Sequence, residues 1–380
     1  MKTEQSIYSE PFGWMHKSDN NLGETAQLIF LFGNRELLKK QEHIDWVRNI
    51  YPNGQIVGCS TSGEIFQEVV MNDNIVCTAV WFENTPIEIA REHIDSMEGS
   101  FMVGEKLAEK LDREDLIHIM ILSEGLNING SELTKGLNSK LNDRIPVTGG
   151  LAGDQADFNE TVIIHNRAAE KNLVLAIGFY GQHLQVGYGS MGGWDSFGVD
   201  REVTRSSGNI LYELDGHPAL ELYKRYLGDH AANLPASAML FPLSLRLTDS
   251  DTSLVRTVLA VDESDGSMIF AGDIPQGEYV RLMKANSDRL IDGAHGAAEM
   301  SKTSLLNATP DLAILISCVG RKLVLKQRVE EELEIIREAI GNVASITGFY
   351  SYGEICPIKP FEPHCELHNQ TMTITLFKEI

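Results

Sequence analysis

The stretch GCSTSGEI, residues 58–65, returns near the end of the chain as GFYSYGEI, residues 348–355. Both copies follow the pattern G-x4-G-E-I, whereas the positions between the two glycines differ. The shared positions are glycine and glutamate, and the cysteine and serines of the first copy have no counterpart in the second. This pattern indicates a repeated backbone corner rather than a reactive group.

The surroundings of the corner repeat as well. An apolar run with strand character and then a segment with helical spacing come before each corner, and a further strand candidate comes after it. These segments are 28–32, 36–50 and 75–82 in the first copy, and 312–317, 326–340 and 371–377 in the second. The repeat is therefore a β-α-β-β unit.

Another, looser copy of the unit lies between these two copies in the sequence. Its corner is GGLAGD, residues 149–154, in which the glycine spacing is shorter by one and aspartate takes the place of glutamate. Its strand, helix and final strand candidates are 117–122, 131–142 and 173–180. The repetition predicts an α/β fold in which repeated β-α-β-β units form mixed sheets flanked by helices, in two domains.

The remaining segment differs from the three units. Residues 255–273 are typical of a hairpin that turns at Asp265 and Gly266, and a long helix is predicted from Glu278 to about Met300. The stretch GYGSMG, residues 187–192, fits the pattern G-x-G-x-x-G formally. Because no helical period follows it, we predict a loop or turn cluster there and no dinucleotide site.

Composition excludes several classes of protein. The 380 residues include 32 basic and 54 acidic side chains, so the net charge of -22 would repel nucleic acid and anionic lipid. The start of the chain has no signal pattern, and no apolar run approaches membrane-spanning length. Five scattered cysteines suit a reducing compartment. We expect a cytoplasmic protein that neither inserts into a membrane nor binds nucleic acid.

The sequence contains candidate residues for two kinds of reactive site. The first corner does not have the G-x-S-x-G spacing of a nucleophile elbow, and we interpret Cys59 as a small buried residue at a strand end. A cysteine-dependent acyl-transfer or hydrolase enzyme remains an alternative. Residue types that commonly bind metals are most concentrated near the end of the chain, at Cys356, His364, Cys365 and His368. Their spacing does not match a standard zinc site. The chain is predicted to be non-catalytic.

The corners suggest a binding site instead. Glycines at a strand end let successive N–H groups point into a concavity that accepts an anion. Glu64 and Glu354 would stand at its rim, either accepting hydrogen bonds from their own loops or fixing the ammonium group of a ligand. We predict that Glu64, Asp154 and Glu354 lie at corresponding strand ends, close to the junction of the domains. Together these features point to a small ligand such as an amino acid.

Seven segments of the sequence resemble the FIST sensory family: VGCSTSGEI, TGGLAGD, the run from GGWDSFGVDREVTRSSGN to ALELYKRYLG, AGDIPQG, SCVGRKL, GFYSYGEI and LHNQTMTITLF. The resemblance covers nearly the whole chain. It implies a FIST N-terminal domain at 25–215 and a FIST C-terminal domain at 216–380.

The family resemblance implies a cytoplasmic sensor that binds a small ligand and signals to a partner such as a histidine kinase, a cyclic-dinucleotide enzyme or a chemotaxis protein. The candidate ligand-binding residues are Cys59, Ser60, Glu64, Gly150, Asp154, Tyr350, Glu354 and Asn369. Some relatives look like haem-based nitric oxide sensors, and for that alternative His368 is the candidate axial ligand. A ligand-free interaction scaffold is a further alternative.

Overall fold

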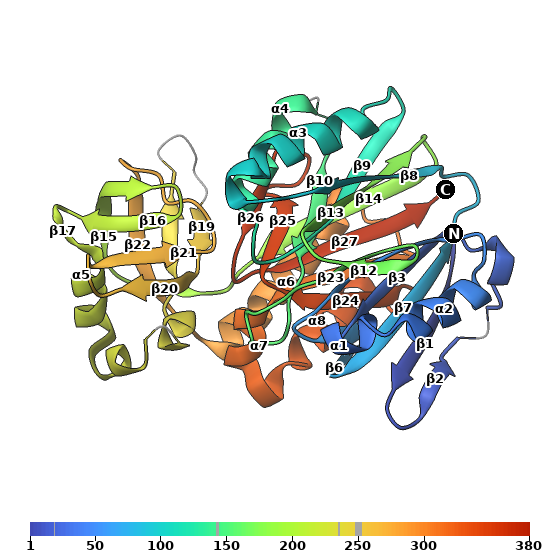
Figure 1. Cartoon of the computed structure of the whole chain (residues 1–380), viewed down its shortest axis with the longest axis horizontal. Coiled ribbons are helices and arrows are strands. Elements are labelled where there is room, and N and C mark those ends of the chain that lie inside the picture. Colours follow the sequence, from blue (N-terminus) through green and yellow to red (C-terminus); the bar gives the residue numbers. More distant parts are fainter. Residues whose placement is uncertain (19, 142–143, 235, 248–252) are drawn as a thin grey trace.

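The computed structural model describes residues 1–18, 20–141, 144–234, 236–247 and 253–380. Figure 1 shows two parts: a large body that contains both ends of the chain, and a small domain at the left that residues 195–284 form. The small domain is inserted between a strand and a helix of the body. The mixed α/β architecture in two domains, with sheets flanked by helices, is confirmed.

Three mixed sheets make up the body. The first has the order β12 (Ala168–Glu170), β11 (Ile163–His165), β4 (Gln55–Ser60), β3 (Leu28–Gly33), β7 (Asn74–Trp81), β1 (Lys2–Ser9), β2 (Gly13–His16). The second has the order β26 (Cys365–His368), β25 (Gly353–Pro357), β10 (Val147–Leu151), β9 (Leu116–Ser123), β13 (Leu173–Tyr180), β8 (Ile87–His93). The third has the order β6 (Val69–Met71), β5 (Glu64–Phe66), β24 (Ser345–Ser351), β23 (Leu312–Cys318), β27 (Met372–Glu379), β14 (Leu184–Met191).

Each sheet is built on the same β-α-β-β unit. In chain order, the corner of the first unit is 58–65, that of the second unit is 149–154 and that of the third unit is 348–355. A parallel pair, β3 with β4, β9 with β10 or β23 with β24, is followed by an antiparallel third strand. The helices between the paired strands are α1 (Arg35–Leu38) with α2 (Gln41–Ile50), α4 (Gly130–Lys140), and α7 (Val319–Leu325) with α8 (Glu331–Ile340). Two further helices, α3 (Ser100–Leu111) and α6 (Ser287–Ser304), precede the second and third units.

The units exchange hairpins. After its corner, the first unit sends β5 and β6 to the sheet of the third unit, where β5 pairs with β24. The third unit sends β25 and β26 to the second sheet, and the second unit sends β11 and β12 to the first. Every sheet is therefore completed by a hairpin from another unit, in a closed cycle.

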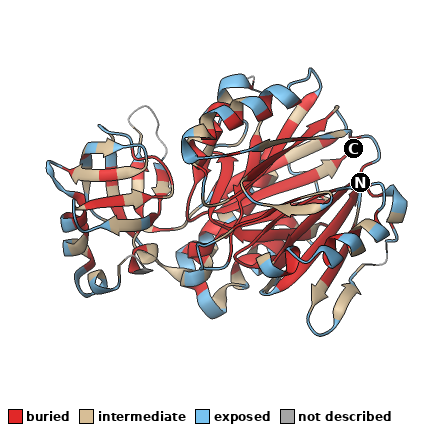
Figure 2. Cartoon of the chain, in the orientation of Figure 1, coloured by how far each residue is buried: buried red, intermediate tan, exposed pale blue. Residues whose placement is uncertain are grey.

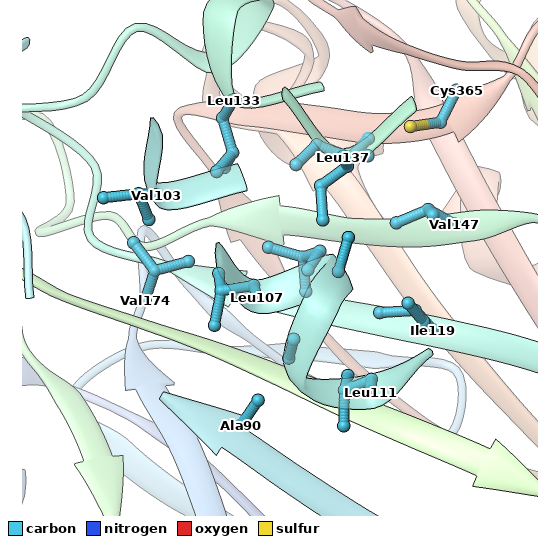
Figure 3. Close-up of a cluster of buried hydrophobic side chains, with 14 of the residues drawn as sticks. Ala90, Val103, Leu107, Leu111, Ile119, Leu133, Leu137, Val147, Val174 and Cys365 are labelled. Atoms are coloured by element: carbon cyan, nitrogen blue, oxygen red, sulfur yellow. The ribbon is translucent and has the colours of Figure 1, made fainter. Parts of the chain in front are cut away.

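The exchange creates one shared core and three outer cores. Phe32, Leu122, Leu175, Ile316 and Phe349 belong to a single buried cluster that all three sheets contribute to. On its other face each sheet is covered by helices. Figure 2 shows that the central strands of the body are buried, whereas edge strands such as β2 and β12 are only partly buried. Figure 3 shows one outer core, where side chains of α3 and α4 pack on the second sheet.

Close packing of the backbones requires a glycine at the first position of each corner. Gly58, Gly149 and Gly348 each pair with an equivalent residue of the neighbouring parallel strand. A Cβ atom at these positions would lie 1.9, 2.1 and 1.8 Å from the carbonyl oxygen of that residue, respectively. Glycine recurs because the backbones of the paired strands approach too closely for any side chain.

The small domain contains the predicted hairpin, with a correction. Its sheet has the order β19 (Ser253–Arg256), β18 (Leu243–Arg246), β22 (Tyr279–Lys284), β15 (Asp195–Ser207), β16 (Ile210–Leu214), β21 (Ser267–Phe270), β20 (Val258–Asp262); β17 (His217–Pro218) pairs with β16, and α5 (Ala219–Leu227) packs beside it. β20 and β21 pair as predicted. The helix predicted from Glu278 begins only at Ser287, because 279–284 form a strand and Asn286 caps the helix.

The glycine-rich stretch is also different from the prediction. Gly187 and Gly189 lie in β14 rather than in a loop, and a Cβ atom on them would lie 2.3 Å and 2.4 Å from backbone oxygens of α6. Glycine is needed there because the helix lies directly on the strand.

Residues 215 and 216, where the sequence predicts a domain boundary, lie between β16 and β17, inside the small domain.

Among the described residues, none of the helices combines the length and apolar character required to cross a membrane.

Candidate functional site

The three corners meet at the centre of the body. Ser62 donates its N–H to the carbonyl oxygen of Tyr350 (2.8 Å), and Tyr350 donates its own N–H to the carbonyl oxygen of Gly63 (2.8 Å). The second corner joins the first through the N–H of Gly153, 3.0 Å from the carbonyl oxygen of Ser60. It joins the third through the N–H of Tyr352, 3.2 Å from the carbonyl oxygen of Leu151. The structure thus brings the repeated corners together.

The two corner glutamates are buried, and each accepts hydrogen bonds from a hydroxyl of its own corner and from a residue at the start of the last strand of its unit. Glu64 accepts hydrogen bonds from the hydroxyl of Thr61 (2.7 Å) and the N–H of Asn74 (3.4 Å). Glu354 accepts from the hydroxyl of Ser351 (2.7 Å) and from the N–H and hydroxyl of Thr371 (3.1 and 2.9 Å). Their side chains therefore fix the turn, which is the first of the two roles that the sequence left open.

Burial makes these carboxyls sensitive to pH. Desolvation raises the pKa of Glu64 to about 8 and that of Glu354 to about 7, from an ordinary value of 4.5. The folded state therefore keeps protons that the unfolded chain releases, so we expect the free energy of unfolding to fall as pH rises from about 5 to about 8. Urea unfolding at a series of pH values from about 5 to about 9 tests this. The double variant Glu64→Gln/Glu354→Gln should lose most of the decline, and an unchanged slope would contradict the assignment.

Asp154 has a different environment from the two glutamates. Its carboxylate accepts hydrogen bonds from the N–H groups of Phe158 (3.0 Å), Asn159 (2.9 Å) and Glu160 (2.8 Å), and from the hydroxyl of Tyr352. It also pairs with Arg35, whose Nη1 lies 2.7 Å away. Asp154 thereby holds the loop that leads to β11 against the first unit.

A small polar cavity lies beside this pair. Its volume is about 110 Å³, and its lining residues are Asn34, Arg35, Glu36, Thr61, Asp154, Gln155 and Asp157. Asp154 is buried, but the side chains of Glu36 and Asp157 are each 61% exposed. Arg35 places its Nε 2.7 Å from Glu36 and its Nη2 3.8 Å from Asp157. The cavity thus offers one guanidinium with two partners that can exchange for a ligand's carboxylate.

The other predicted ligand-binding residues do not line this cavity. Cys59 and Gly150 are buried in the sheets, and burial raises the pKa of the Cys59 thiol, opposite to what a reactive cysteine requires. The hydroxyl of Ser60 accepts from the N–H of Val162 (3.0 Å). Tyr350 donates its hydroxyl to Glu332 (2.6 Å).

Asn369 lies at the contact with the small domain. Its Nδ2 donates to the carbonyl oxygen of His368 (3.0 Å), and its Oδ1 accepts from the N–H of Thr257 (3.5 Å) in the small domain. Nearby, the buried Arg256 of the small domain donates to the carbonyl oxygen of Leu367 (2.9 Å). Asn369 therefore helps to join the two domains, and it does not line the polar cavity.

His368 does not fit the role of a haem axial ligand in this conformation. Its ring is buried, and its Nε2 lies 2.9 Å from the carbonyl oxygen of Cys356 in the paired strand. It lines neither the polar cavity beside Arg35 nor the three other cavities whose lining includes Arg113, Leu126 or Pro363. Burial lowers its pKa to about 4. Within the described ranges no three His, Cys, Asp or Glu side chains group as a metal site, and all five cysteines are unpaired and buried.

Sequence reasoning missed most of the cavity. It noted the arginine in GNR, residues 33–35, and in VGR, residues 319–321, only as part of the repeat. The structure shows that both follow the first strand of a unit, where Arg35 faces the cavity and Arg321 is fully buried. The recurrence of an arginine directly after the first strand of two units is the sequence signal that could have pointed to this cavity.

Comparison with known proteins agrees with this architecture. The family models of the FIST N domain and the FIST C domain match residues 27–217 and 219–357, and the chain belongs to the FIST family. FIST domains are associated with sensory signal transduction. The two matches meet inside the small domain, between β17 and α5, so the family's division of the sequence differs from the division in space.

Two similar proteins add little on function. The uncharacterized protein MJ1623 of Methanocaldococcus jannaschii is 24% identical over 345 residues, and the match covers 83% of this chain and 64% of that protein. The chain thus spans less than two thirds of the relative's length. A solved structure, cyanuric acid hydrolase from A. caulinodans, aligns at 9% identity with a TM-score of 0.19, over 78% of this chain and 99% of that one. A similarity this low carries no argument about fold or function.

Proposed function

We propose that this protein is a non-catalytic sensor that binds a small amino-acid-like ligand in the polar cavity beside Arg35 and passes the signal to a partner protein. The observation that carries the proposal is the pairing of a guanidinium with exposed carboxylates around one cavity. Arg35 offers N–H groups to a carboxylate, and Glu36 and Asp157 offer negative charge to an ammonium group. A zwitterionic ligand carries both a carboxylate and an ammonium group, so it would pair with the arginine and with the acidic side chains at the same time.

The size and position of the cavity support the same ligand class. A volume of about 110 Å³ corresponds to roughly three or four water molecules at liquid density, which suits the charged head of an amino acid. Thr61 and Asp154, which line it, belong to the first and second corners. A ligand there touches the junction on which all three sheets depend, so binding can favour one arrangement of the units over another.

The setting and the partner are also proposals. We place this sensor in the cytoplasm, because its five buried, unpaired thiols suit a reducing compartment. We propose that the partner is a signalling protein such as a histidine kinase or a cyclic-dinucleotide enzyme, reached through a protein surface.

Replacing Arg35 by alanine is expected to weaken binding of the stabilising amino acid by about 10- to 100-fold, the range for losing a hydrogen bond to a charged group. The ligand is first found by thermal shift with a panel of amino acids, and its affinity is then measured by calorimetry. Arg113→Ala is the matched control, because Arg113 makes exposed ion pairs with Glu88 and Asp115, outside the cavity.

Two results would contradict this function. If no amino acid in the panel stabilises the protein, the ligand class is wrong. If Arg35→Ala and Arg113→Ala bind the stabilising amino acid equally well while both remain folded by circular dichroism, the ligand binds elsewhere.

A further inference from the structure

A second cavity has Phe158, from the loop that Asp154 holds, among its lining residues. It is a crevice of about 70 Å³ between the body and the small domain. Leu126, Ile128, Phe158 and Tyr352 line it from the body, and Leu259 and Phe270 line it from the small domain. We propose that this crevice holds a short aliphatic side chain of the same ligand whose charged head binds beside Arg35; this inference rests on the proposed function.

The chemistry of the crevice selects an uncharged apolar group. None of the described residues that line it is charged. Its two amide side chains already have partners: Asn129 donates to Asp273 (2.9 Å), and Asn209 donates to the carbonyl oxygen of Phe270 (2.8 Å). A polar group placed there would lose its hydration among mostly apolar side chains.

Size narrows the class further. An engineered apolar cavity of about 150 Å³ accommodates benzene, and this crevice, at about 70 Å³, has about half that volume. By the same proportion about three carbons fill the crevice, which matches the isopropyl group of valine, and the fourth side-chain carbon of leucine would reach its mouth. The ligand class is therefore an amino acid of the valine or leucine type, and an aromatic amino acid is too large.

Exposed apolar side chains mark the mouth of the crevice. Met97, Phe158 and Leu259 are 43, 43 and 45% exposed, and they come from three separate segments. Large apolar side chains that converge while remaining exposed are typical of a binding surface. Because Leu259 belongs to the small domain, a guest in the crevice would touch both domains at once.

One carboxylate connects the two cavities. Asp154 lines the polar cavity, and it accepts the N–H of Phe158 and the hydroxyl of Tyr352, which both line the crevice. The rings of Phe158 and Tyr352 are stacked, with centroids 4.5 Å apart and planes 12° apart. A ligand that occupies both cavities would therefore have to displace the Phe158 ring, which is 43% exposed.

Calorimetry with glycine, alanine, valine, leucine and phenylalanine on the whole chain tests this inference. We expect affinity to rise about fourfold for each added methylene from alanine to leucine and to fall for phenylalanine. Leu259→Ala should reduce the preference for leucine over alanine. Leu306→Ala is the matched control, since Leu306 is 69% exposed and lies outside the crevice.

The outcomes separate the two proposals. Equal affinity across the series, with binding still lost in Arg35→Ala, would overturn the crevice assignment and leave the proposed function standing. The crevice assignment is likewise wrong if Leu259→Ala and Leu306→Ala keep the same preference for leucine. If none of the five amino acids binds, the proposed function fails and the crevice assignment fails with it.

Discussion

Replacing Arg321 by methionine is expected to lower the free energy of unfolding by about 3 to 5 kcal/mol. Arg321 is fully buried, and its Nη2 and Nε lie 2.8 and 3.1 Å from a carboxylate oxygen of Glu332, which is also fully buried. Arg321 also donates to the carbonyl oxygen of Leu290 (2.7 Å). Removing the guanidinium leaves an uncompensated negative charge in the interior.

Two further variants establish the cause. Arg321→Met combined with Glu332→Gln should recover part of the loss, because the unpaired charge is gone and an amide oxygen can still accept from Tyr350. Arg328→Met, which breaks an exposed pairing with Glu331 and Asp288, should leave the urea midpoint unchanged. If the two single variants unfold at the same urea concentration, the buried pair has no special role.

The second large effect concerns the first glycine of the third corner. Gly348→Ala is expected to destabilise the protein by about 3 kcal/mol or more, at or above the upper end of ordinary overpacking. The added Cβ atom would lie 1.8 Å from the carbonyl oxygen of Leu315. That oxygen belongs to the backbone of a central strand, so it cannot rotate away as a side chain would.

Gly99→Ala is the matched control for this substitution. No atom lies within 4 Å of a Cβ built on Gly99, and its backbone angle suits any residue. We expect this variant to unfold within error of the parent protein by thermal and urea denaturation. A Gly348→Ala protein as stable as Gly99→Ala would show that the paired strands separate without cost, contrary to the packing described.

Much of the fold could be predicted from the sequence because the repeat is local. Strand, helix and corner follow one another along the chain, and glycine marks each corner where two backbones meet. The exchange of hairpins could not be predicted, since nothing in the sequence of β5 or β25 says which distant strand it will pair with. The sequence predicts helix at 279–284, where the structure has a strand. The extended conformation depends on pairing with β15 and β18, and the local sequence does not specify these partners.

The candidate site was only partly accessible for a related reason. The corner glutamates stood out because they repeat, and repetition reflects their shared task of capping the turn. Arg35 and Asp154 line the cavity together although they lie far apart in the chain. Their pairing depends on the loop before β11, which has no counterpart after the other two corners. The cavity depends on a loop that only the second unit has, so the repeated pattern in the sequence does not predict it.

Because the hairpins are exchanged in a cycle, each unit depends on another to complete its sheet. A polypeptide with one unit alone would be left with an unfinished sheet and a hairpin that has nowhere to pair. Three such polypeptides could satisfy one another by trading these pieces around a ring, as a homotrimer. In this protein the three units belong to one polypeptide, so the ring of exchanged hairpins forms without the association of separate subunits.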